Sequence, residues 1–215
     1  MKLNHDKTKL LCISAAKSYS PTAFIKVSND ESIISTSEMK VLGFYFNNEP
    51  NVKFNMNKVQ SKFKSRLWSL RHLKKNGFEK DELVKVYQTM IRPIAEYCSS
   101  VFHTLITQSD SLELERIQMQ ALKVIFGCKW SYSELLEKSG LEKLHVRREA
   151  AFVRLAVKMS ESARYSSLFP RRLYRAGVTV RNPEKYKVYK ASTGRYLNSP
   201  LNMMRRKLND LEGIQ

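Results

Sequence analysis

The spacing of apolar residues changes near residue 55, and this change constrains the fold more than any other feature. Beyond it, apolar residues recur at steps of three and four, which places them on one face of a helix. These residues are Met56, Val59, Phe63, Leu67, Leu70 and Leu73. Gly77 then predicts the end of the helix. Before residue 55 the apolar runs are short, as in strands, so the sequence predicts an α+β fold class.

The first part of the chain predicts a small antiparallel sheet. Residues 8–14, 23–28 and 40–46 read as strands, because they carry β-branched and aromatic residues between turn-forming stretches. Gly43 lies inside the third strand, which indicates a bulge or the close approach of another backbone.

The helical part continues with a wide apolar face from Asp81, the expected N-cap, to Val101. Pro93 falls inside this pattern and is expected to kink the helix. Further helices are predicted from Asp110 to Gly127, over 133–138 and over 141–161.

The chain is expected to divide into a sheet-containing part (1–54), a helical domain (55–163) and a basic extension (164–215). The extension has weak periodicity, so we expect it to order partly or only on a ligand, with a helix over 203–211.

The chain has 215 residues and a formal net charge of +18, and the charge is uneven. Residues 55–80 carry eight Lys or Arg against one acid, and residues 145–215 carry sixteen against five. Residues 81–144 carry seven against nine. An excess of this kind attracts polyanions, so the two basic blocks predict a nucleic-acid surface.

Several classes of protein are not indicated. Cys12, Cys98 and Cys128 are too far apart for a disulfide framework or a zinc motif, and we expect them to pack in the core. The N-terminus has no apolar signal region, and no apolar run approaches the ~20 residues of a membrane span. We therefore expect an intracellular protein, cytoplasmic or nuclear and not secreted, with no membrane partner.

No enzyme signature stands within the chain. Its aspartates are Asp6, Asp30, Asp81, Asp110 and Asp210. Two-metal polymerases need carboxylates gathered at one place, and these residues are dispersed. We expect no independent catalysis.

Five motifs occur in an order that is typical of one family. Leu3-Asn4-His5-Asp6-Lys7-Thr8-Lys9 precedes an apolar stretch, and Leu42-Gly43 lies in the strand over 40–46. Tyr87 is followed by Arg92-Pro93 and then Glu96-Tyr97. Leu114-Glu115-Arg116-Ile117-Gln118 and Arg147-Arg148 complete the series. Over about residues 1–160, the chain resembles the end of the palm and the thumb of a non-LTR (LINE-type) retrotransposon reverse transcriptase.

The resemblance implies a fragment of an RNA-directed DNA polymerase that grips a duplex of RNA template and DNA primer. The family's Asp-Asp pair, which binds Mg²⁺, stands upstream of the Lys-Thr motif, so we expect no cofactor in this chain. The remainder of the palm is an implied partner.

Two of these motifs carry implied roles. Lys7 corresponds to a lysine thought to protonate the leaving pyrophosphate, although it also suits an ordinary surface lysine. Leu42, Gly43 and Phe44 correspond to the primer grip, a hairpin that presses near the terminal sugar of the primer, although they equally suit a core strand in which glycine relieves crowding.

The helix that begins near residue 55 carries a basic stripe. Lys64, Trp68, Arg71 and Lys75 share a face beside the apolar one, which suits contact with a duplex backbone. The alternative is a solvated face with Trp68 half-buried against a neighbour.

A second basic set consists of Arg147, Arg148, Arg171 and Arg172, with tyrosines such as Tyr186 and Tyr189 between or after them. Arginine can bind phosphates and tyrosine can stack on bases. A nuclear-import patch or a merely solubilising extension remains an alternative for this set.

Two other functions are compatible with the sequence. One is a free-standing, non-enzymatic basic helical protein that binds RNA or DNA. The other is a helical bundle that binds proteins, which would make the basic stripe irrelevant to the ligand.

Overall fold

The computed structural model describes residues 8–14, 24–26, 32–49, 51–173, 184–190 and 192–212. Lys7 therefore lies outside the described residues. The fold is α+β, as predicted, with small antiparallel sheets followed by helices. Internal contacts divide the chain into two compact units, residues 1–61 and 62–215. This division differs from the predicted boundaries, because helix α1 crosses it and residues 164–215 belong with the helical unit.

Where the structure describes it, the first unit contains two separate pairs of antiparallel strands. β1 (Phe24–Lys26) pairs with β2 (Ser32–Ile34), and β3 (Glu38–Val41) pairs with β4 (Phe44–Asn47). Residues 8–14 do not form the predicted strand, since only Leu10 makes a bridge, to Ser35.

The predicted strand over 40–46 is in fact a hairpin that turns at Leu42-Gly43. Both residues have positive φ, 47° for Leu42 and 88° for Gly43, as a type I′ turn requires. Gly43 therefore serves a tight turn and not the expected bulge. Beside the turn, Phe44 is buried and lies 4.8 Å from Phe46, ring centre to ring centre.

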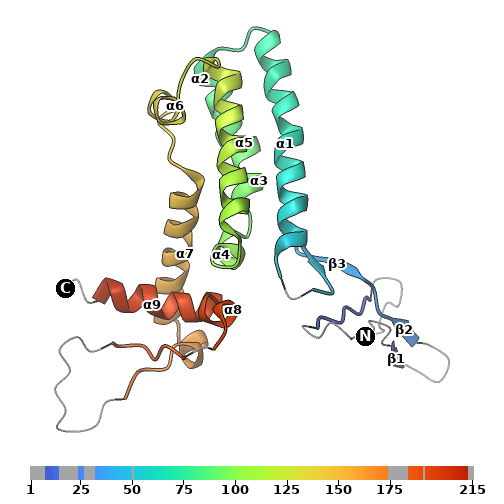
Figure 1. Cartoon of the computed structure of the whole chain (residues 1–215), viewed down its shortest axis with the longest axis vertical. Helices are drawn as coiled ribbons and strands as arrows, with labels where there is room; N and C mark the ends of the chain where they lie inside the picture. The colour runs from blue at the N-terminus through green and yellow to red at the C-terminus, as the bar shows by residue number, and fades with distance from the viewer. Residues whose placement is uncertain are drawn as a thin grey trace. The chain divides into compact units, whose positions relative to one another are not determined.

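The helical elements are α1 (Lys53–Lys75), α2 (Lys80–Val86), the π-helical turn η2 (Tyr87–Ile91), α3 (Arg92–Glu96), α4 (Ser99–Phe102), α5 (Gln108–Phe126), α6 (Tyr132–Ser139), α7 (Leu144–Glu161), the 3₁₀ turn η3 (Ala163–Leu168), α8 (Gly194–Leu197) and α9 (Pro200–Glu212). Within the helical unit, α7 contacts α4, α5 and α9. Figure 1 shows α5 running beside α7 and α9 crossing the C-terminal end of α7.

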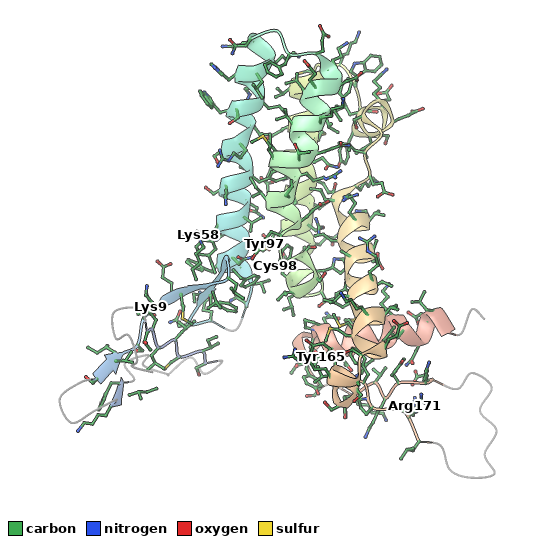
Figure 2. The ribbon with its side chains drawn as sticks, turned by 180° about the vertical axis from the view of Figure 1, so that it is seen from behind. Lys9, Lys58, Tyr97, Cys98, Tyr165 and Arg171 are labelled. Atoms are coloured by element: carbon green, nitrogen blue, oxygen red, sulfur yellow. The ribbon has the colours of Figure 1, made fainter. Side chains whose placement is uncertain are left out.

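The expected kinked helix over 81–101 is broken into several pieces. It begins after Glu79, which forms a capping box with Glu82, and not at the predicted cap Asp81. Pro93 falls in the first turn of α3, directly after η2, where its missing N–H is tolerated. The sharp break comes later, at Cys98, whose φ is 55° (Figure 2).

The apolar face of α1 is buried as predicted. Phe63, Leu67 and Leu70 are almost fully shielded from solvent. The ring of Phe63 lies 6.5 Å from that of Tyr87 in η2, so α1 packs on the helices that follow it.

A buried polar network centres on α5. The Tyr87 hydroxyl donates to Gln118 Oε1 at 2.6 Å. Gln118 Nε2 donates to the Tyr132 hydroxyl at 2.9 Å and to the Glu142 carbonyl at 3.0 Å. One turn earlier, the Glu115 carboxylate accepts from the Tyr132 hydroxyl at 2.5 Å. It also accepts from the first amides of α7, those of Leu144 and His145.

The described part of 164–215 packs on α7 instead of forming a separate extension. A second apolar cluster joins Phe152, Ala156, Phe169, Tyr186, Met204 and Leu208. The helix predicted over 203–211 is present as α9, which supplies the last two of these residues.

We predict that Phe63→Ala lowers the free energy of unfolding by roughly 3–5 kcal/mol, because it leaves a cavity between α1 and η2. Chemical denaturation would measure the change. Arg71→Ala, on the exposed face of the same helix, should change stability by less than about 0.5 kcal/mol. Equal effects of the two substitutions would contradict this assignment of the helix faces.

We predict that Gln118→Leu destabilises the fold by roughly 1–3 kcal/mol, because the Tyr87 hydroxyl loses its acceptor and the Glu142 carbonyl loses its donor. Gln120→Leu makes the same replacement on the exposed side of α5 and should be nearly neutral. The two denaturation midpoints provide the comparison, and coincident values would show that the network contributes nothing.

Candidate nucleic-acid interface

Helix α1 is strongly cationic along its whole length. Its 23 residues include eight Lys or Arg and no Asp or Glu. Acids on the same helix would partly neutralise these charges through i,i+3 and i,i+4 pairs, and none is present. The helix therefore presents an uncompensated positive surface wherever it is exposed.

The predicted stripe of Lys64, Trp68, Arg71 and Lys75 lies on the exposed side of α1. Trp68 is 65% exposed and stacks on His72, with ring centres 5.2 Å apart. Its ring is therefore open to solvent and not half-buried against a neighbouring helix. Among the described residues, Arg71 and Lys75 make no ion pair.

Lys64 differs from the other members of the stripe. Its Nζ lies 2.5 Å from Glu113 Oε1 on α5. The hydrogen bond from Lys64 lowers the pKa of Glu113, so this carboxylate stays ionised and partly neutralises the lysine. Lys64 thus connects α1 to α5, and Arg71 and Lys75 carry the more available charge.

A groove of about 660 Å³ lies beside the stripe, between α1 and the segment from α2 to α3. Lys62, Arg66, Trp68 and His72 line one side of it, and Met90 is among the residues lining the other. Such a groove combines cations with an open aromatic surface, a combination that suits a sugar or a base next to a phosphate.

The sequence analysis did not include Arg66, His72 or Met90 in the site. Lys62, Arg66 and Ser69 follow one another at steps of four and three, and this spacing could have indicated a second polar face of α1. The exposure of Met90 could not have been anticipated, because it depends on the π-helical turn before Pro93.

Arg147 and Arg148 do not form the predicted nucleic-acid surface. The guanidinium of Arg147 is paired with Glu96, through both Nε and Nη2. Arg148 is 1% exposed, so the prediction that it contacts a duplex backbone from the surface is wrong, because its buried guanidinium cannot reach that backbone. This difference between Arg147 and Arg148 follows from the helical period of α7, which turns one of two adjacent residues inward.

The second pair, Arg171 and Arg172, lies after η3, where Figure 2 labels Arg171. Both side chains are exposed, but Arg172 is paired with Glu184. Tyr186, which bridges to Arg171, is buried against Phe169 and is not free to stack on a base. Arg171 thus remains the more available cation of this pair.

The primer-grip-like residues lie in the hairpin of the first unit. Leu42 is at the turn and is 88% exposed, whereas Phe44 is buried. An exposed leucine with positive φ is unusual, since β- and γ-carbons crowd the backbone there. The turn thus presents one apolar side chain to solvent.

Among the described residues, no three His, Cys, Asp or Glu side chains are grouped closely enough to hold a metal ion. Within the same residues, no helix has the length and apolarity needed to cross a membrane.

Comparison with known proteins identifies no relative. No family model matches the chain, and no curated protein or solved structure does so.

We predict that binding of a nucleic-acid duplex changes the fluorescence of Trp68. The measurement is cleanest in a Trp130→Phe background, because the chain has two tryptophans. Without a ligand, acrylamide should quench Trp68 efficiently, since its ring is exposed. A duplex should reduce this quenching, and unchanged quenching at saturation would remove Trp68 from the interface.

Proposed function

We propose that this chain binds the backbone of a nucleic-acid duplex through α1, as the thumb of a non-LTR retrotransposon reverse transcriptase would. The observation that supports this most strongly is the open ring of Trp68 on a helix with eight cations and no acid. The order of motifs from Lys7 to Arg147 supports the assignment to this class of polymerase.

In this proposal the chain holds the template–primer duplex and does not carry out the chemical step. That step belongs to the metal-binding aspartates of the family's catalytic strand. Arg71 and Lys75 contact phosphates, and Trp68 lies against a sugar or an unpaired base. Leu42, at the exposed hairpin turn, contacts the end of the primer.

The physical basis of binding is the release of counterions from the duplex. Each phosphate that a lysine or arginine neutralises frees condensed cations, which favours association. Flexible cations on one helix face do not read base edges, so binding should be independent of sequence. An RNA–DNA hybrid also offers a wide minor groove lined with sugars, which suits this mode.

A second candidate function is a free-standing RNA- or DNA-binding protein. The compactness of residues 62–215, which contain the whole stripe, favours it. The two candidates differ in their dependence on a primer end. A reverse-transcriptase thumb with its grip should prefer a hybrid with a recessed 3′ end over a blunt duplex, and Leu42→Ser should reduce that preference.

We predict that Arg71→Glu with Lys75→Glu lowers the affinity for an RNA–DNA hybrid and flattens its dependence on salt. The slope of log affinity against log salt should fall by about two units, at about 0.9 for each lost phosphate contact. Fluorescence anisotropy at several salt concentrations measures the slope. Lys64 is left unchanged so that its pair with Glu113 is preserved.

The matched control is Lys80→Glu with Lys85→Glu, which reverses two exposed cations of α2. Both double variants lower the formal net charge of +18 by the same amount. Only the α1 variant should lose the two units of slope. Equal losses would mean that binding depends on total charge and not on the stripe.

A further inference from the structure

Arg148 is buried, and most of the nitrogens of its guanidinium lack a hydrogen-bond acceptor. It is 1% exposed, and Nη2 donates to Ser111 Oγ at 2.7 Å. Nε and Nη1 have no hydrogen-bond partner. Arginine keeps its proton even when buried, so this site contains a cation that lacks most of its hydrogen bonds. Such a group is costly unless something pairs with it.

The nearby carboxylates are already engaged with other groups. Glu96 pairs with Arg147, and Glu115 accepts from the Tyr132 hydroxyl and the first amides of α7. Within the described parts of the chain, no acid forms an ion pair with Arg148. Glu115 and Glu96 favour the charged form of Arg148 through space, but they leave its Nε and Nη1 without an acceptor.

Arg148 lines a cavity of about 350 Å³ at the start of α5. The polar lining consists of His103, Thr107, Gln108, Ser111, His145 and Arg148. His103 Nδ1 is also buried without a hydrogen-bond partner. Two unpartnered groups, from α7 and from the end of α4, thus line the same cavity.

The first turn of α5 adds to this positive environment. Backbone N–H groups in a first helical turn lack intrahelical acceptors, and the helix dipole favours an anion there. Thr107 caps the turn by accepting from the Asp110 amide at 3.1 Å, and its hydroxyl donates to Asp110 Oδ2 at 2.7 Å. The Asp110 carboxylate belongs to this turn and offsets part of its positive field, but it does not line the cavity.

We infer that this cavity binds a phosphate group, held by Arg148 and His103 with Ser111 and the first turn of α5. A tetrahedral oxyanion has enough acceptor oxygens for donors that converge from three helices, and guanidinium matches its geometry. The phosphate can be free inorganic phosphate or the terminal phosphate of a nucleic acid. This inference does not depend on duplex binding by α1.

The charge of Arg148 also acts on His103. Burial, and then the charge of Arg148, lower the pKa of His103. A phosphate beside both groups would offset the effect of the Arg148 charge on the pKa of His103.

The test is a calorimetric titration of the full chain with inorganic phosphate, with sodium chloride of equal ionic strength as the reference. The wild type should bind one phosphate saturably at millimolar concentration or below. Arg148→Met should weaken binding roughly ten- to hundredfold, as expected for the loss of charge-assisted hydrogen bonds. No saturable binding to the wild type, or unchanged binding to Arg148→Met, would overturn the inference.

A second variant covers the case in which Arg148→Met does not fold. His103→Gln alters a half-buried residue and should weaken phosphate binding without unfolding the chain. If it binds phosphate like the wild type, His103 is not a ligand and the site as inferred is wrong. The Arg71→Glu and Lys75→Glu double variant should bind phosphate normally, which separates failure of this inference from failure of duplex binding.

The source of the phosphate is distinguished with two single-stranded oligonucleotides that differ only in a 5′-phosphate or a 5′-hydroxyl. Tighter binding of the phosphorylated strand, lost in Arg148→Met, supports the cavity as a site for a nucleic-acid end. Equal binding of both strands, together with saturable binding of inorganic phosphate, supports it as a site for free phosphate.

Discussion

The arrangement of the helical unit depends on two side chains of α5, Glu115 and Gln118. Gln118 joins η2 to α6 through two tyrosine hydroxyls and holds the Glu142 carbonyl. Glu115 caps the start of α7 through two backbone amides. Because these hydrogen bonds are directional, they fix which residues of each helix face inward. Apolar packing alone would fix this less strictly. Because this cap fixes where α7 begins, it also sets which way Arg147 and Arg148 face.

Burial keeps the two tyrosines of the network protonated. It raises the pKa of both Tyr87 and Tyr132, so their hydroxyls remain donors. Glu115 can then remain the acceptor for Tyr132 and for the amides of α7. The two tyrosine hydroxyls therefore act as permanent donors in the connection between the helices.

Internal pairing also explains why the surface of α1 is positive. Acids of the helical unit are used within it: Glu96 pairs with Arg147, Glu113 with Lys64, and Glu149 with Lys207 at 2.5 Å. Such pairs connect helices, and in the described ranges of the chain no acid forms an ion pair with Arg71 or Lys75. The exposed part of α1 therefore attracts an external polyanion.

The sequence predicted those elements that depend on local spacing. The apolar face of α1 and the end of α5 at Gly127 follow from periodicity and capping, which neighbouring residues determine. The strand pattern read residues 40–46 as one strand, because Leu42 is a poor residue for positive φ and gave no turn signal beside Gly43. Only the resemblance to the primer grip implied a hairpin there.

The fates of the predicted site residues depended on tertiary contacts that periodicity does not report. Adjacent arginines at 147 and 148 looked equivalent, yet one pairs with Glu96 and the other is buried beside Ser111. Lys64 seemed equivalent to Arg71 in the sequence, yet it forms an ion pair with Glu113, which lies on α5 and is distant in sequence. Burial of Tyr186 likewise required α9 to fold back onto α7.

The central claim is that α1 contacts the duplex through its exposed stripe, and photo-crosslinking tests it most directly. An RNA–DNA hybrid with photoreactive bases would be irradiated with the full chain, and the modified residues located by mass spectrometry. The account predicts crosslinks at Trp68 and at neighbouring residues of α1 between Lys62 and Lys75. Crosslinks confined to other segments, such as Arg171 and Arg172, would contradict it.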